Sequence, residues 1–237
     1  KDGAGHGGGQ DGKTGAPRRG RVFFARAARA RVPVALHFDH GFTPELVKKA
    51  VDLGFTSVMF DGSMLPFADN ARLTRELGAY ARRSGCSIEA EIGHVGSNGS
   101  AEDALSQSVY TEPDEALRFA MDSGCDALAI AIGTAHGVYR EAPRLSYDAL
   151  SAIANVCSTP LVLHGGSGLT DEAFQETIRR GISKINIFTH NNLAAARAAH
   201  DAYTGQTGAF ELMGPVTQAV QRETMRLIRV FGSDGKA

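Results

Sequence analysis

Short apolar runs alternate with amphipathic segments along most of the chain, and this alternation predicts the fold. The apolar runs predict six strands, at 33–39, 56–61, 87–92, 127–132, 160–164 and 183–188. The segments between and after them predict helices at about 43–53, 66–84, 113–123, 146–156, 170–180, 190–204 and 213–231. Strands that are apolar on both faces are typical of parallel sheets covered by helices, so we expect six βα units.

The repeated βα unit is an α/β pattern, and it favours a TIM barrel of the (β/α)8 type that is incomplete at its N-terminus. A doubly wound open sheet is the rival architecture. Residues 1–20 are rich in glycine and almost free of apolar side chains, so we expect a disordered or non-native segment there. The chain has 237 residues and 43% hydrophobic content, which is enough for one barrel domain over residues 21–237.

Charge and cysteine content narrow the class of protein. A formal net charge of −1 provides no basic field, so we expect no nucleic-acid partner. The apolar runs are too short to cross a bilayer, so we expect no membrane contact. The three cysteines are scattered without a CxxC spacing, and no secretory signal follows the N-terminal charges. These features predict a reduced, cytoplasmic protein.

Three of the predicted strands carry a histidine at or just past their end, followed at once by glycine. These histidines are His40, His136 and His164. A single residue of this kind is more often a hydrogen-bonded loop histidine than a metal ligand. Three at equivalent positions favour a metal, because catalytic zinc commonly keeps three protein ligands and one open position. The sequence therefore predicts a metal site formed where three strands end.

Acidic residues lie at the ends of the first three predicted strands. An acid in an apolar strand is costly to bury unless it is paired or bound to a cation. Asp39 precedes a candidate ligand and is a candidate general acid or base, whereas Asp61 and Glu91 are candidates for orienting the histidines or for a second cation position. We expect Glu89 to form only an ion pair with a neighbouring strand. His37 shares a face with Asp39 by strand alternation, and we expect a satisfied interior residue.

A glycine-rich turn after the fifth predicted strand is a candidate anion site. It reads His164-Gly165-Gly166-Ser167-Gly168 and precedes the helix that Thr170 opens. Backbone N–H groups in such a turn, next to a helix N-terminus, form a cradle for phosphate. The end of the next strand supplies an amide from Asn186 and a hydroxyl from Thr189.

At these residues the sequence resembles the class II, zinc-dependent fructose/tagatose-bisphosphate aldolases. The stretches that carry the resemblance follow the family's order over about residues 33–237: PVALHFDHG, SVMFDGS, IEAEIGHVG, YTEPDEA, DALAIAIGTAHGVY, PLVLHGGSGL, GISKINIFT and IRVFGSDGKA. The resemblance implies a (β/α)8 barrel with a Zn2+ cofactor, and Na+ or K+ as a further cation. It also implies sugar-phosphate substrates in carbohydrate metabolism such as glycolysis, and a homodimer or homotetramer.

By the same resemblance, each candidate residue takes a role. The zinc ligands of the family match His40, His136 and His164, and the acid that exchanges a proton with the C4 hydroxyl of the substrate matches Asp39. The acids beside the metal match Asp61 and Glu91. The loop for phosphate and a monovalent cation matches Gly137, Gly165 and Ser167. The groups that hold the dihydroxyacetone-phosphate end match Asn186 and Thr189. A metal-dependent aldolase needs no Schiff-base lysine, so we expect Lys184 to be structural.

The chain departs from the family's pattern in three places. It has no counterpart to the two βα units that precede the first matching strand. The loop that carries the family's C3 acid offers only Glu102 or Asp103, and His190 stands where an acid usually follows Thr189.

These features are compatible with three functions. The first is zinc-dependent aldol cleavage or condensation of a ketose 1,6-bisphosphate, fructose or tagatose, with dihydroxyacetone phosphate and glyceraldehyde 3-phosphate as the triose partners. The second is a catalytically inactive, truncated homologue that binds sugar phosphate or a partner chain; the missing units favour it, and the retained histidines and Asp39 disfavour it. The third is a zinc hydrolase on the same barrel. The candidate phosphate site, formed by the glycine-rich turn and the end of the next strand, disfavours it.

Overall fold

Six parallel strands form one sheet in the computed structural model of the protein, which describes residues 25–93, 96–97, 110–136 and 143–236. The strands are β1 (His37–Gly41), β2 (Ser57–Phe60), β3 (Ser87–Ile92), β5 (Ala127–Ile130), β7 (Leu161–Leu163) and β8 (Ile182–Ile185). Their order in the sheet is their order in the sequence. A doubly wound sheet reverses its strand order at a switch point, so the rival architecture was wrong.

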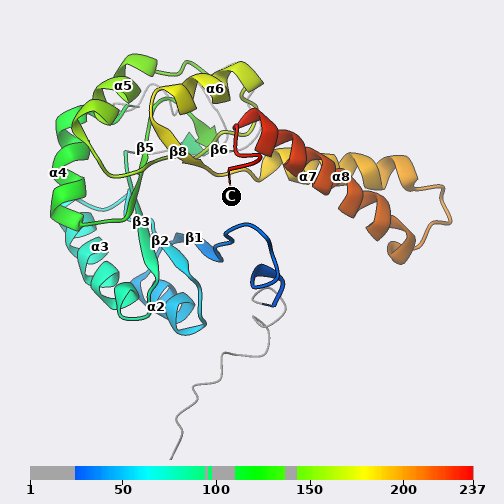
Figure 1. The fold of residues 1–237 in the computed structure, drawn as a ribbon, viewed down its shortest axis with the longest axis horizontal. Coiled ribbons are helices and arrows are strands. Elements are labelled where there is room, and N and C mark those ends of the chain that lie inside the picture. The colour runs from blue at the N-terminus through cyan, green and yellow to red at the C-terminus, as the bar shows by residue number, and fades with distance from the viewer. Residues whose placement is uncertain (1–24, 94–95, 98–109, 137–142, 237) are drawn as a thin grey trace, which may run out of the picture.

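Helices follow the strands in sequence and cover one face of the sheet. They are α2 (Pro44–Asp52), α3 (Phe67–Arg82), α4 (Pro113–Ser123), α5 (Tyr147–Val156) and α6 (Asp171–Arg179). Figure 1 shows them as an outer arc around the curved strands, which together form a half-barrel. The last two helices, α7 (Thr189–Ala202) and α8 (Ala209–Val230), pack against each other and project away from this body. Among the described helices, none has the length and apolar character needed to cross a membrane.

The ends of the helices follow from local side-chain chemistry. Thr43 caps α2, where its hydroxyl oxygen accepts a hydrogen bond of 3.3 Å from the N–H group of Leu46. Ser146 and Thr170 cap α5 and α6 in the same way. Gly124 ends α4 in the left-handed conformation, with φ at 61°. Because these signals are local, the helices expected from the sequence overlap the observed ones over most of their length.

The hydrophobic core fills the layer between the sheet and its helices. Its larger cluster includes Phe119 and Phe174, and both side chains are fully buried. Burying a side chain of this size contributes about 1.5–3 kcal/mol. Along β3, alternation sends Ile88 into this layer and turns Glu89 to the opposite, interior face. The apolar layer thus fixes which strand residues reach the interior.

The strands deviate from the expected ranges more than the helices do. The expected strand at 33–39 forms only at His37–Gly41, and the expected strand at 183–188 ends at Ile185. A short strand that the sequence did not predict, β4 (Gly96–Ser97), lies between β3 and α4 and pairs in parallel with β6 (Ala135–His136). The glycine-rich segment 1–20 lies outside the described residues.

Candidate active site

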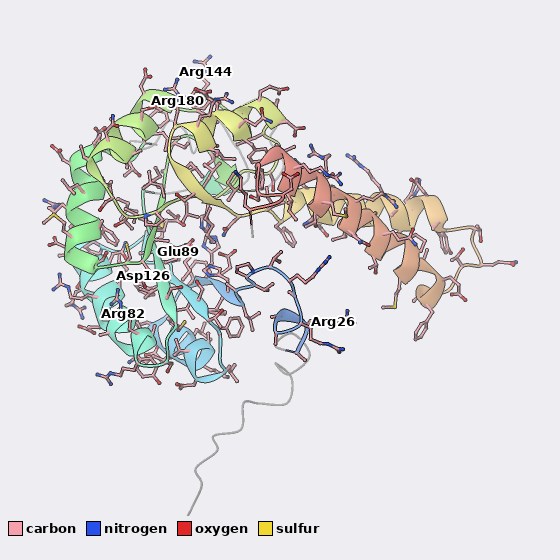
Figure 2. All side chains as sticks on the ribbon, viewed as in Figure 1. Arg26, Arg82, Glu89, Asp126, Arg144 and Arg180 are labelled. Atoms are coloured by element: carbon pink, nitrogen blue, oxygen red, sulfur yellow. The ribbon has the colours of Figure 1, made fainter. Side chains whose placement is uncertain are left out.

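A cluster of polar side chains lies at the carboxyl ends of the strands, on the interior side of the half-barrel. Figure 2 shows one member, Glu89, inside the curve of the sheet. Several members are two residues apart on one strand and therefore share a face. The cluster consists of His37, Asp39 and His40 from β1, Asp61 after β2, Glu89 and Glu91 from β3, His164 after β7, and Lys184 and Asn186 at the end of β8.

Two consecutive residues of β1, Asp39 and His40, both reach this cluster, which regular strand alternation does not allow. The register between β1 and β2 shifts between Phe38 and Gly41. Within that shift His40 has φ at 47°, and no other non-glycine residue in the described ranges has a positive φ. This irregularity turns His40 back toward the interior. Gly41 permits it, because a Cβ atom there would lie 2.6 Å from the carbonyl oxygen of Met59.

The rings of His40 and His164 face each other at the centre of the cluster. Nε2 of His40 lies 3.0 Å from Nδ1 of His164, and the ring planes are 87° apart. The other nitrogen of each ring lies 2.8 Å from a carboxylate oxygen, which belongs to Asp61 for His40 and to Glu89 for His164. An ionised carboxylate only accepts hydrogen bonds, so each neutral imidazole donates its N–H group outward. The two ring lone pairs then point toward one another, an arrangement that favours a cation between them.

A second chain of contacts runs from Glu89 to Asp39. Nζ of Lys184 lies 2.7 Å from Oε2 of Glu89 and 2.7 Å from Oδ1 of Asn186. Nδ2 of Asn186 in turn donates a hydrogen bond of 2.9 Å to Oδ1 of Asp39. These contacts connect a buried acid of β3 to a half-exposed acid of β1 through two residues of the last strand.

Both acids at the ends of this chain stay ionised at neutral pH. Burial alone would raise the pKa of Asp39, but contact with His37 and the surrounding positive charges outweigh it and lower the pKa to about 2. Burial would likewise raise the pKa of Glu89, but the hydrogen bond from His164 and the charge of Lys184 lower it. Asp39 is therefore available as a proton acceptor, and its side chain is 50% exposed.

The other expected site residues are placed as follows. Glu91 lies beside the facing rings, with Oε2 3.9 Å from Nδ1 of His164. Ser167 accepts a hydrogen bond of 3.1 Å from the backbone N–H group of Thr189, which joins the glycine turn to the start of α7. Gly165 has φ at 67° and lies so close to β6 that a Cβ atom would be 2.7 Å from backbone atoms of Ala135.

One expected zinc ligand, His136, is placed only by its backbone. It lies in β6, where it pairs with Ser97, and its side chain is outside the described part of the structure. Gly137, Glu102 and Asp103 also fall outside the described residues. The structure thus brings Asp39, His40, Asp61, Glu91, His164 and Asn186 into one cluster, and it places Gly165, Ser167 and Thr189 along the adjoining turn.

For Glu89 and Lys184, two members of the cluster, the sequence predicted only structural roles. Glu89 was expected to pair with a neighbouring strand, but Lys184 lies on β8, and β5 and β7 separate it from β3. The expectation was wrong because the sheet curves, so residues of distant strands meet in its interior. Strand alternation could have found both residues, since Glu89 and Lys184 each precede a candidate site residue by two positions.

Comparison with known proteins identifies the family. The family model for class II fructose-bisphosphate aldolases matches residues 10–236. The chain therefore belongs to this family, which supports aldehyde-lyase chemistry on sugar phosphates. A fructose-bisphosphate aldolase of Geobacillus stearothermophilus is 40% identical over 210 residues, covering 87% of this chain and 72% of that enzyme.

Two other relatives share the same level of similarity. YdjI of Escherichia coli K12, described as an uncharacterized protein, is 41% identical over 217 residues, covering 91% of this chain and 77% of YdjI. The crystal structure of the YdjI aldolase matches with a TM-score of 0.81 and 37% identity, over 92% of this chain and 77% of that chain. A 6-phospho-5-dehydro-2-deoxy-D-gluconate aldolase of Shouchella clausii is 41% identical over 209 residues, covering 87% of this chain and 71% of that enzyme. By name, these relatives include aldolases of different substrates.

Proposed function

We propose that the protein is a zinc-dependent aldolase that cleaves a ketose 1,6-bisphosphate, fructose or tagatose, and catalyses the reverse condensation. The products of cleavage are dihydroxyacetone phosphate and glyceraldehyde 3-phosphate. The observation that carries the proposal is the pair of facing ring nitrogens of His40 and His164, 3.0 Å apart and beside Asp39. Family membership supports the aldol reaction class.

The donor set of the cluster fits zinc. His40 and His164 each offer one ring nitrogen, and the second nitrogen of each ring donates to a carboxylate, as is usual for zinc-binding histidines. His136 is the proposed third ligand, because its neighbour Ala135 lies against Gly165, the residue after His164. When bound, zinc supplies a Lewis acid that polarises the substrate carbonyl.

Asp39 is the proposed acid–base residue. Its low pKa keeps it ionised, so in cleavage it accepts the proton of the C4 hydroxyl, and in condensation it returns that proton. Asn186 donates a hydrogen bond to it and holds the carboxylate in place. Asp61 and Glu91 lie beside the metal position, Asp61 as the acceptor of the His40 N–H group.

The glycine turn after β7 is the proposed phosphate site. Its backbone N–H groups, the hydroxyl group of Ser167 and the start of α7 at Thr189 form one connected loop region next to His164. Gly137 and Gly165 are proposed to complete this region for phosphate and for a monovalent cation, Na+ or K+. Thr189 and Asn186 are proposed to hold the dihydroxyacetone-phosphate end.

The proposal extends to the architecture and assembly of the whole molecule. We assign the half-barrel to the (β/α)8 type, because its six strands are parallel, sequential and covered by helices on the outside. We also propose a dimer or tetramer. The projecting α7–α8 hairpin supports it, because Phe210 is 87% exposed and Met213 is 61% exposed there. Light scattering of the purified protein measures the mass of the assembly.

The proposed function is tested by zinc content together with cleavage of fructose and tagatose bisphosphates, with a chelator control. A panel that adds 6-phospho-5-dehydro-2-deoxy-D-gluconate covers the substrate named for one relative. We expect chelator-sensitive cleavage and about one zinc ion per chain. His164→Ala should lose zinc and cleavage together, whereas Asp39→Asn should keep zinc and lose turnover. Zinc binding without cleavage of any substrate would favour the inactive homologue instead.

A further inference from the structure

Lys184 holds two residues of the cluster at once. Its side chain extends from β8 and is 35% exposed, and its ammonium group lies 2.7 Å from both Oε2 of Glu89 and Oδ1 of Asn186. Both of these residues contact the proposed site. Glu89 accepts from Nε2 of His164. Asn186 donates to Asp39, and its Nδ2 also lies 3.3 Å from Nε2 of His164.

The contact with Asn186 decides which way its side-chain amide points. An ammonium group carries only donors, so the amide atom beside Lys184 has to be the oxygen. The NH2 group is then directed at Asp39, where it donates to Oδ1 at 2.9 Å. A carboxylate only accepts hydrogen bonds, so Asp39 favours the same orientation from the other end of the amide. Lys184 anchors the oxygen end of Asn186 and so holds the donor that faces Asp39.

The contact with Glu89 supports a buried charge. The Glu89 side chain is only 2% exposed, and its two oxygens have separate partners: Oε1 accepts from Nε2 of His164, and Oε2 accepts from Lys184. A buried carboxylate without a cation is strongly destabilised. Glu89 fixes the hydrogen on Nε2 of His164, so that Nδ1 keeps its lone pair toward His40.

We infer that Lys184 is a positioning residue that couples the two halves of the proposed site, through Glu89 to the ring of His164 and through Asn186 to the carboxylate of Asp39. This inference rests on the proposed function, since it concerns the proposed zinc ligand and the proposed acid–base residue. Lys184 acts through its two acceptors.

The first experiment compares Lys184→Met with Arg226→Met. Arg226 is a matched control, because it is a partly exposed cation that bridges two carboxylates, those of Asp171 and Glu223, neither of which belongs to the cluster. The readouts are zinc affinity by chelator competition, kcat and KM. We expect Lys184→Met to weaken zinc binding by about 10–100-fold and to lower kcat, as loss of a residue behind a metal ligand does. Arg226→Met should leave both unchanged, and Lys184→Arg should recover part of the loss.

The second experiment separates the two contacts of Lys184. Asn186→Asp keeps an acceptor for the ammonium group but removes the donor to Asp39, so it should lower kcat by a larger factor than it weakens zinc binding. The double variant of Asn186→Ala and Lys184→Met should lower kcat by less than the product of the factors for the two single variants, because both residues act on the carboxylate of Asp39. This cycle distinguishes positioning from a direct substrate contact of Asn186.

Three results would overturn the inference. One is a Lys184→Met variant that loses thermal stability but keeps the zinc affinity and kcat of the wild type. Lys184→Met would then resemble the control Arg226→Met in both of these readouts. The second is full additivity in the double variant. The third applies if Lys184→Met does not fold. In that case, an Asn186→Asp variant that keeps the kcat of the wild type would overturn the inference. Failure of the proposed function shows differently, since the wild-type protein would then neither bind zinc nor cleave any bisphosphate.

Discussion

Each of the two facing histidines keeps one ring nitrogen for a carboxylate, and at His40 this carboxylate is itself held in place. Asp61 accepts hydrogen bonds from the backbone N–H group and the hydroxyl group of Ser63, at 3.2 and 2.7 Å. Burial would raise the pKa of Asp61, but the bonds from His40 and Ser63 outweigh it and lower the pKa. An ionised Asp61 thus fixes the hydrogen of His40 on Nδ1 and leaves Nε2 directed into the cluster.

This pairing predicts a pH-dependent stability of the metal-free protein. The hydrogen bond to Asp61 is the main cause that raises the pKa of His40 above 6.5, so the protonated form favours the folded state. That contribution is complete below about pH 6.5 and is lost as the pH rises through the raised pKa. The lowered pKa of Asp61 acts only at acid pH, because its contribution is lost as the pH falls below about 4.

The measurement is urea denaturation of chelator-treated wild type and Asp61→Asn between about pH 5.5 and 9.5, the range in which histidine titrates. The wild type should be the more stable protein at the acid end, and the difference should shrink as the pH rises. A difference that grows with pH would contradict the assignment of the hydrogen bond to His40.

At the scale of residues, the sequence predicted some of the side chains that gather but not how they meet. Asp39, His40 and His164 could be found because each stands at a strand end. The inward turn of His40 could not be predicted, because alternation assigns neighbouring residues to opposite faces and the positive φ of His40 breaks that rule. The pairing of Glu89 with Lys184 depends on the curvature of the whole sheet, which no local pattern reports.

At the scale of elements, the turn after β7 is held against the short strand β6. Gly165 makes this approach possible, since its φ is 67° and a Cβ atom would meet the carbonyl group of Ala135. The approach brings the ends of two segments together, one with His164 and one with His136. β6 itself was not expected, because two residues leave no periodicity to recognise, whereas the capped helices were predicted from local signals.

Gly165→Ala should therefore destabilise the protein more than a matched glycine substitution. Gly85 is the control, because it has the same φ of 67° and a Cβ atom there would have no neighbour within 4 Å. The left-handed conformation costs each variant about 1–2 kcal/mol. Only Gly165→Ala adds repulsion with the backbone of Ala135, so its unfolding free energy should fall further and its zinc affinity should fall with it. Equal losses of stability, with zinc binding retained, would show that the approach to β6 is loose.

At the scale of the molecule, the cluster joins strands that lie far apart in the sheet. His40 comes from β1 at one edge, and His164 follows β7, next to the opposite edge strand β8. The hydrogen bond between Asp39 and Asn186 links the two edge strands directly. A ligand that binds both histidines therefore holds the two ends of the sheet together, and unfolding has to release it.

This arrangement predicts that zinc raises the melting temperature of the chelator-treated protein. A ligand that binds only the folded state at 100 times its Kd stabilises it by about 2.7 kcal/mol. For a chain of this size that corresponds to a shift of about 5–10 °C, which differential scanning fluorimetry resolves. The shift should grow with zinc concentration and disappear in His40→Ala and in His164→Ala, while Arg226→Met keeps it. Since the first two variants alter opposite ends of the sheet, a shift that survives either of them would mean that zinc stabilises the protein from elsewhere.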